Sequence, residues 1–334
     1  MHRPSRSSGS ACLSCEPLED RLTPAFANPP LPGETDAIAI VPNIIGPILI
    51  PGYAISRGAN VDVFNTDGSL RATFVPFAGF AGQVVVGTGS RDGLGLTTIV
   101  ASANGHVKVF DRFTGGWASG AEVRSFLAYS GFTGNVSVGG GDVNRDGAAD
   151  IITGASTNGH VKVFDGRTGA EFKSFFAYPG ATGGISVAAG DVNGDGFADI
   201  VTGASANGHV KVFDGQSQVP IHSFFAYPGF TGSVSAGAGD LNRDGFDDII
   251  TGASVNGHVK AFDGRTGTEF DSFFAFPGAR GNVTVAGVDT NTDGTDELLV
   301  GVAGGTVNLF DGQNHSLLYS VDPLAAVSRG VFVS

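Results

Sequence analysis

Residues 190–215 have the sequence Gly-Asp-Val-Asn-Gly-Asp-Gly-Phe-Ala-Asp-Ile-Val-Thr-Gly-Ala-Ser-Ala-Asn-Gly-His-Val-Lys-Val-Phe-Asp-Gly, and close copies of this stretch return along the chain. Its acidic part, Asp-x-Asn-x-Asp-Gly-x-x-Asp, starts at Asp191. The same pattern, with Glu in the last position of one copy, starts again at Asp142, Asp240 and Asp289, so that successive copies lie 49 residues apart. Self-similarity at a fixed period indicates a repeat protein, and four copies in one register indicate one structural unit used repeatedly.

Each copy predicts four short strands. Around the stretch quoted above, the strand-like segments are residues 185–188, 200–203, 209–213 and 221–225. Asn-Gly pairs, which favour type I′ hairpins, start at residues 104, 158, 207 and 256 and would join the second strand to the third. Repeated four-stranded antiparallel meanders are typical of β-propeller blades, which bury the faces of each sheet against its neighbours. The 53 glycines and 26 phenylalanines also favour an all-β protein.

The number of third strands predicts the number of blades. These strands fall at residues 61–64, 107–110, 161–164, 210–213, 259–262 and 307–310. We therefore expect an all-β β-propeller of six four-stranded blades, with seven as the alternative. Residues 328–333 resemble the first strand of a further repeat, so pairing of the N- and C-terminal strands should close the first blade and leave no open edge. We assign residues 1–35 to a disordered tail or targeting segment and residues 36–334 to the propeller.

The acidic loops have the composition of calcium sites. Side-chain oxygens at positions 1, 3, 5 and 9, a carbonyl at position 7 and a glycine at position 6 provide an almost entirely protein-derived oxygen cage, whereas Mg²⁺ usually keeps several waters. Zinc or iron would require His or Cys, which the loops lack. The alternative is a set of Asx-turns without metal. The predicted calcium ligands of the four sites are Asp142, Asn144, Asp146, Ala148, Asp150, Asp191, Asn193, Asp195, Phe197, Asp199, Asp240, Asn242, Asp244, Phe246, Asp248, Asp289, Asn291, Asp293, Thr295 and Glu297.

A related segment at residues 90–98 has lost most of these ligands. Its ligand positions hold Ser90, Asp92, Leu94 and Thr98. We expect it to bind no calcium.

Residues 190–215 resemble FG-GAP/VCBS repeats, the family that includes the integrin α-subunit propeller. The resemblance extends over about residues 36–334 and implies a calcium loop between the first and second strands of a blade. Two features differ: the Phe-Gly element is mostly absent, and integrins usually have seven blades. Residues 16–24, Glu-Pro-Leu-Glu-Asp-Arg-Leu-Thr-Pro, resemble a short element near the N-termini of many exported planctomycete proteins. This second resemblance implies a bacterial protein that is extracellular or on the cell surface.

Charge and motifs exclude several functions. A net charge of −13 argues against nucleic-acid binding, and four Ca²⁺ would reduce it to −5. No apolar run is long enough to cross a membrane. The chain has no phosphate-binding loop, dinucleotide fingerprint or Ser/His/Asp arrangement. A histidine recurs at one equivalent position directly after a hairpin turn, which favours a role at the hairpin end and in the contact between blades over a catalytic or metal-binding role. Phe-Phe pairs recur from residues 175, 224 and 273, which favours packing between blades over a sugar-binding platform. The histidines are His106, His160, His209 and His258.

These observations predict a calcium-binding, extracytoplasmic propeller. We expect it to be a monomer without enzymatic activity that acts as an interaction or adhesion scaffold for a protein or polysaccharide at the cell surface. The alternatives are a carbohydrate-binding lectin and a propeller-type polysaccharide lyase.

Overall fold

The computed structural model describes residues 52–57, 59–65, 68–90, 96–111, 122–302, 306–321 and 331–333. Contacts within the chain separate Met1–Gly46 from Pro47–Ser334, and all described residues belong to the second unit. The predicted tail at residues 1–35 therefore lies outside the described residues, as does most of the segment at residues 90–98. No helix in the described ranges is long and apolar enough to span a membrane.

The described strands form six four-stranded antiparallel sheets, each with an innermost, a second, a third and an outermost strand. The innermost strands are β24 (Val331–Val333), β4 (Val85–Ser90), β8 (Val136–Gly141), β12 (Ile185–Gly190), β16 (Val234–Gly239) and β20 (Val283–Val288). The second strands are β1 (Gly52–Arg57), β5 (Leu96–Ala103), β9 (Asp150–Ala155), β13 (Asp199–Ala204), β17 (Asp248–Ala253) and β21 (Glu297–Val302). The third strands are β2 (Asn60–Asn65), β6 (His106–Asp111), β10 (His160–Phe164), β14 (His209–Phe213), β18 (His258–Phe262) and β22 (Val307–Phe310). The outermost strands are β3 (Leu70–Phe74), β7 (Glu122–Leu127), β11 (Glu171–Phe176), β15 (Pro220–Phe225), β19 (Glu269–Phe274) and β23 (Leu317–Val321).

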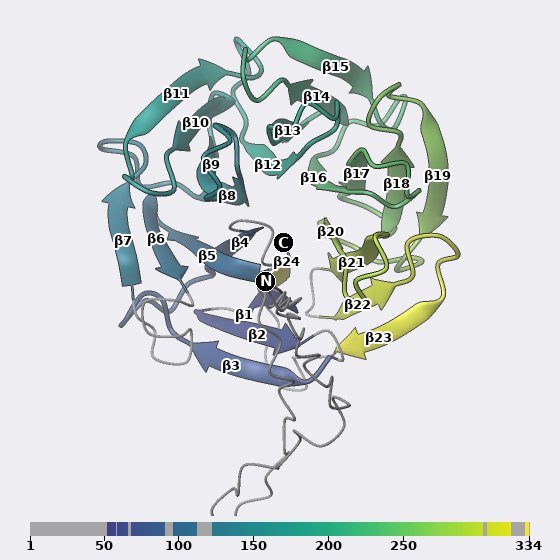
Figure 1. The fold of residues 1–334 in the computed structure, drawn as a ribbon, viewed down its shortest axis with the longest axis horizontal. Coiled ribbons are helices and arrows are strands. Elements are labelled where there is room, and N and C mark those ends of the chain that lie inside the picture. The colour runs from purple at the N-terminus through teal and green to yellow at the C-terminus, as the bar shows by residue number, and fades with distance from the viewer. Residues whose placement is uncertain are drawn as a thin grey trace, which may run out of the picture. The chain divides into compact units, whose positions relative to one another are not determined.

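We number the sheets in the order in which their third strands occur, so that β2 belongs to sheet 1 and β22 to sheet 6. Figure 1 shows the sheets following one another around a ring. The predicted all-β propeller of four-stranded blades is confirmed. The described strands do not form the seven-bladed alternative.

The Asn-Gly pairs form the hairpin turns that their sequence predicts. Asn158 and Gly159, for example, have φ angles of 64° and 61°, and the other three pairs likewise have positive φ at both residues. Positive φ at both central positions is the requirement of a type I′ turn, which matches the twist of the flanking strands. The second and third strands are therefore joined as expected.

The apolar core is divided among the sheet interfaces. Over the described residues, buried side chains form six clusters, each made by two neighbouring sheets. Between sheets 3 and 4, for example, Ile152 and Val163 pack with Val187 and Ile200. Between sheets 6 and 1, Leu299 and Leu309 pack with Phe64. The ring is therefore closed by hydrophobic packing, without a single central core.

The last described strand completes the first sheet. β24 pairs antiparallel with β1, through Ile55 opposite Val333 and Arg57 opposite Val331. The expectation that the C-terminal strand completes the first blade is confirmed. The N-terminal partner is β1, which occupies the second position in the sheet, while the innermost strand comes from the other end of the chain.

A tyrosine hydroxyl joins three of the connecting segments to the sheet that follows. Tyr178 comes after β11, and its Oη donates to the carbonyl oxygen of Thr202 in β13 at 2.9 Å, with Thr202 Oγ1 at 3.1 Å. Tyr129 and Tyr227 make equivalent contacts with sheets 3 and 5. These hydroxyls are buried, so each needs a partner within the protein.

Two other junctions lack both members of this polar pair. Phe276 takes the place of the tyrosine before sheet 6, and Val300 occupies the register position of Thr202. Phe77 and Ala101 replace the pair before sheet 2. When both hydroxyl groups are replaced by apolar side chains, no buried hydroxyl is left unpaired. These two connecting segments can therefore pack on the next sheet without the hydrogen bond.

We expect Tyr178→Phe to lower the free energy of unfolding by about 1–2 kcal/mol, because the carbonyl oxygens of Thr202 and His209 then lose the buried hydroxyl that contacts them. The double variant Tyr178→Phe/Thr202→Val should lose less than the sum of the two single variants, since it reproduces the Phe276/Val300 junction. Denaturant unfolding of the four proteins provides the test. Additive losses, or no loss for Tyr178→Phe, would contradict the expectation.

We expect deletion of residues 331–334 to lower the melting temperature and to promote association, because the edge of β1 loses its partner strand. Removal of Ser334 alone is the control and should change neither property. Calorimetry and light scattering give the two readouts. A monomeric deletion variant with an unchanged melting temperature would show that β24 contributes nothing to closure.

Candidate metal centres

The four acidic loops connect the innermost strand to the second strand in sheets 3 to 6. We call residues 142–150, 191–199, 240–248 and 289–297 acidic loops 1 to 4. In each loop the glycine at position 6 has a φ between 81° and 85°, as the sequence predicts. Position 4 is also left-handed, at Arg145, Gly194, Arg243 and Thr292. This second feature was not expected, because only one of the four residues is glycine.

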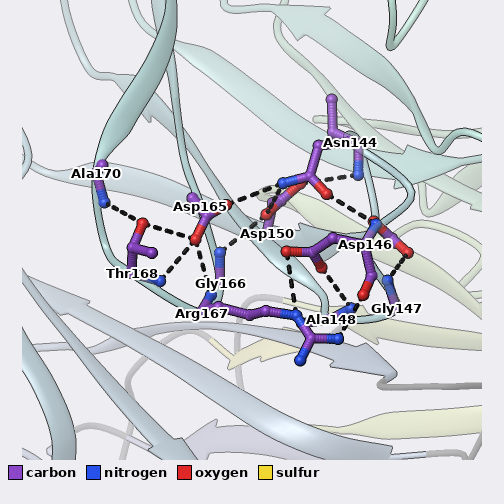
Figure 2. A network of polar contacts seen from close by, with 12 residues as sticks. Asn144, Asp146, Gly147, Ala148, Asp150, Asp165, Gly166, Arg167, Thr168 and Ala170 are labelled. Atoms are coloured by element: carbon purple, nitrogen blue, oxygen red, sulfur yellow. Dashed lines mark hydrogen bonds and ion pairs between the residues drawn. The ribbon is translucent and has the colours of Figure 1, made fainter.

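Backbone amides hold the first three ligand side chains of each loop in place. In acidic loop 1, Asp142 accepts hydrogen bonds from the amides of Asp146 (3.0 Å) and Gly147 (2.8 Å). Asn144 Oδ1 accepts from Asp146 N at 2.9 Å, and Asp146 Oδ1 accepts from Ala148 N at 2.8 Å. Figure 2 shows Asn144 and Asp146 with the hydrogen bonds that hold their side chains. The same bonds recur in acidic loop 2.

The position-9 carboxylate ties the loop to the rest of its sheet. Asp150 is fully buried; its Oδ2 accepts from Val143 N at 3.0 Å, and its Oδ1 accepts from Gly166 N at 2.8 Å. Burial raises the pKa of Asp150 to about 7, although these two hydrogen bonds oppose the shift, and the charges of Asp142 and Asp146 raise it further.

The other three loops have the same feature. Burial also raises the pKa values of Asp199 and Asp248 to about 7, and it raises the pKa of Glu297. Without a cation, each loop therefore contains a carboxylate that is costly to ionise.

A second carboxylate, from the turn after the third strand, also contacts the loop and was missed by the sequence analysis. Asn144 donates through Nδ2 both to Asp150 and to Asp165 Oδ2, the latter at 3.1 Å (Figure 2). Asn193 contacts Asp214 in the same way at 3.3 Å. The side-chain hydrogen bond from Thr168 is the main cause of the lowered pKa of Asp165. The available signal was the Phe-Asp pair that ends the third strand in each of these repeats.

Neighbouring acidic loops are also joined to each other. The amides of Ala198, Asp247 and Asp296, all at position 8, donate to the first carbonyl of the preceding loop at 2.8–3.0 Å. The carboxylates of Asp247 and Asp296 accept the amides of Asp191 and Asp240 in return, at 2.7 and 2.8 Å. Burial raises the pKa of Asp247 to about 6 and that of Asp296 to about 8. Sequence analysis missed these two carboxylates because position 8 is alanine in the other two loops.

The donor set fits a hard divalent cation in its chemistry. In the part of the chain that the structure describes, the position-7 carbonyl oxygens accept no hydrogen bond, although Ala148 and Thr295 are buried. No group of three or more His, Cys, Asp or Glu side chains among the described residues is gathered closely enough to hold a metal by itself. A cation in these loops would therefore also need the amide and carbonyl oxygens.

The recurring histidines lie outside the acidic loops and have structural contacts. His160 Nε2 lies 2.9 Å from Ser174 Oγ, and its ring stacks on Phe176 at 4.5 Å and meets Tyr129 edge-on at 5.3 Å. Because Tyr129 comes from the segment before sheet 3, the predicted role at the hairpin end and in the contact between blades is confirmed. Burial lowers the pKa of His160.

The Phe-Phe pairs divide into two roles, and only one was predicted. Phe175 packs against Phe213 of the next sheet at 4.8 Å, which confirms blade packing. Its neighbour Phe176 is 53% exposed and stacks on His160 instead. The prediction of packing between blades is therefore wrong for the second phenylalanine of the pair. Alternate residues of a strand face opposite sides of the sheet, so Phe176 points away from the side on which Phe175 packs.

In calcium-free protein, we expect stability to fall as the pH rises from about 6.5 to about 8. Aspartates ionise near 3.8 in the unfolded chain but near 7 or 8 in the folded loops, so the folded state binds more protons in this window and a rising pH favours unfolding. The histidines with a lowered pKa act in the opposite direction, but only below about 6.5.

Melting temperatures measured in chelator across this pH range provide the test. Asp150→Asn should show a shallower pH dependence, and Glu171→Gln, which removes an exposed carboxylate, should match the parent protein. A melting temperature that stays constant or rises with pH would contradict the expectation.

Comparisons with known families agree with the loop geometry. A model described as an FG-GAP-like repeat matches residues 142–202, from acidic loop 1 into β13. A model described as an FG-GAP repeat matches residues 232–268, which contain acidic loop 3. No curated protein matches the chain. The four-stranded sheets, the acidic loops between their first two strands and the two family matches together show that this chain is an FG-GAP repeat protein.

Proposed function

We propose that the protein is a calcium-stabilised, non-catalytic interaction scaffold that works outside the cytoplasm and binds a protein or polysaccharide at the cell surface. Its FG-GAP propeller fold suggests an interaction scaffold. The observation that carries the calcium proposal is an arrangement shared by the four loops. Each loop has a buried carboxylate whose ionisation is unfavourable, further carboxylates nearby, and a position-7 carbonyl oxygen that accepts no hydrogen bond from the described residues.

Calcium would be held by the side chains at positions 1, 3, 5 and 9 and the carbonyl at position 7 of each loop. As a hard divalent cation, it would supply positive charge to carboxylates that burial otherwise disfavours. In acidic loop 1, Arg167 already offsets part of the charge, because its Nε lies 3.2 Å from Asp146 Oδ2. In acidic loop 2 the position of Arg167 holds Gln216, and Arg145 reaches this loop at the backbone carbonyl oxygen of Asp195, not at its carboxylate. We therefore expect loop 2 to depend more strongly on calcium than loop 1.

An extracytoplasmic location suits such sites. Extracellular calcium modules often bind with dissociation constants of about 10⁻⁴–10⁻³ M. The N-terminal resemblance to exported proteins supports the same location.

Within the scaffold, the repeated positions maintain the ring, so we propose that positions where the repeats differ determine the partner.

We expect chelation to lower the melting temperature and added calcium to restore it. At about 10 mM calcium, each site with this affinity would contribute about 1–3 kcal/mol. Magnesium at the same concentration should restore less. Calorimetry in chelator, calcium and magnesium provides the test, and equal melting temperatures in all three would contradict the proposal.

Two variants localise the effect. Asp195→Asn in acidic loop 2 should reduce the stabilisation by calcium, because it removes a charged ligand; Arg145 contacts the backbone carbonyl oxygen of Asp195, whereas Arg167 contacts the carboxylate of Asp146. Glu171→Gln, an outer-strand carboxylate paired with Lys162, is the matched control and should leave it unchanged. An equal response of both variants to calcium would place the effect outside the loops.

A further inference from the structure

A cavity of about 240 Å³ lies where the innermost strands of sheets 3 to 6 come together, with β4 of sheet 2 on one side. Its lining comes from the beginnings of β8, β12, β16 and β20 and from residues at the ends of the second strands. The acidic loops join the opposite ends of these strands. The cavity and the acidic loops therefore lie at different ends of the sheets.

One set of hydroxyl groups in the lining comes from a repeated position. Ser137, Ser186, Ser235 and Thr284 are each the second residue of an innermost strand. The same register position in sheet 2 holds Val85, as the pairing with the second strand shows. Four sheets thus present hydroxyls, whereas the fifth presents an apolar side chain, and this difference breaks the symmetry of the repeat.

The hydroxyls provide both donors and acceptors. Ser137 Oγ accepts from Val187 N at 3.1 Å, and Ser186 Oγ accepts from Ala236 N at 3.0 Å, so both retain a proton to donate. Ser235 instead donates to the carbonyl oxygen of Val283 at 2.5 Å, which leaves its lone pairs available. The bonds to neighbouring sheets also fix the rotamers, so the groups are preorganised.

The lining contains a second set of hydroxyl groups. Ser156, Ser205 and Ser254 follow the second strands of sheets 3, 4 and 5 and line the cavity. Their Oγ atoms form no hydrogen bond with any described residue of the chain. They are therefore free to bond to a ligand without loss of an internal contact.

No charged side chain is among the described residues that line the cavity. A carboxylate, phosphate or ammonium group would therefore lose its hydration there without a compensating charge. A neutral molecule with several hydroxyls would find both donors and acceptors, and its C–H groups could pack against Val85 and the other valines of the wall. A cavity of roughly 150 Å³ is enough for benzene, so this one can take a single six-membered ring with substituents.

We propose that this cavity binds one neutral sugar unit, either a free monosaccharide or the end of a saccharide chain. The proposal goes beyond the scaffold function and does not depend on calcium, because no acidic-loop residue lines the cavity. A peptide with free termini is a poorer match, since its charged termini would lose their hydration without an opposite charge in the wall. The combination of hydroxyl groups from four sheets with an uncharged wall that is otherwise lined mainly by valines selects the sugar.

The test measures binding of the methyl glycosides of glucose, galactose, mannose, rhamnose, fucose and N-acetylglucosamine to the full chain by saturation-transfer NMR and calorimetry. At least one should bind saturably, and glucuronic acid and glucosamine should bind more weakly than their neutral counterparts. Measurements in calcium and in chelator, below the melting temperature, separate this result from that of the calcium proposal. If no glycoside binds, or if a charged sugar or an uncharged peptide binds in preference, the proposal is overturned.

Two variants place the bound sugar. Ser156→Ala/Ser205→Ala/Ser254→Ala breaks no internal hydrogen bond of a described residue and should weaken binding at least about tenfold, the equivalent of about 1.4 kcal/mol. Ser137→Ala/Ser186→Ala should do the same, with its fold checked by melting. Ser174→Ala/Ser223→Ala/Ser272→Ala, on the outermost strands of the same three sheets, is the matched control and should retain the parent affinity. Equal binding by the parent and both cavity variants would place the sugar elsewhere.

Discussion

A buried carboxylate at the start of the second strand is the constraint on which the four repeats with an acidic loop depend. In sheet 3, Asp150 joins the amide of Val143 in the loop to that of Gly166 in the turn after the third strand. Asn144 adds a link to the neighbouring turn carboxylate. One side chain thus fixes the loop, the second strand and the turn after the third strand relative to one another. The cost is the desolvation of a carboxylate. A nearby cation would offset that cost, which is why the loops and the stability of the ring are coupled in our account.

The coupling extends across sheets 3 to 6 because successive acidic loops share backbone hydrogen bonds. Asp247 and Asp296 each make a reciprocal contact with the loop before them. On the outer rim, the outermost strand of each of sheets 2 to 5 contacts the next sheet through Arg124, Lys173, His222 or Asp271. The chemistry of this rim contact changes from sheet to sheet while its position stays the same. Stability is therefore distributed over the interfaces, as expected for repeat proteins.

Much of the fold could be predicted from the sequence because its determinants are local. The strands around residues 190–215 follow from short apolar segments, and the turns follow from Asn-Gly pairs whose left-handed conformation is intrinsic to those residues. The completion of sheet 1 by β24 was also predictable, because residues 328–333 repeat an earlier innermost strand. The direction of the second phenylalanine in each Phe-Phe pair was missed, since it depends on which face of the outermost strand is covered.

The site was predicted in its ligand positions but not in its surroundings. Asp165, Asp214, Asp247 and Asp296 act on loops that lie 21 to 56 residues away, and nothing in the local sequence indicates which loop they reach. The cavity likewise requires serines 49 residues apart to face one another, which only the closed ring brings about. Local patterns therefore predicted the repeat, whereas the contacts between repeats required the structure.

The most direct test of the account is the number of calcium ions bound per chain, measured by native mass spectrometry of protein that has been freed of metal and then titrated with calcium. The account predicts that binding saturates at four ions per chain, one for each acidic loop. A chain that binds no calcium at millimolar concentrations would contradict it, because hydrogen bonds within the protein would then stabilise the buried carboxylates without a cation.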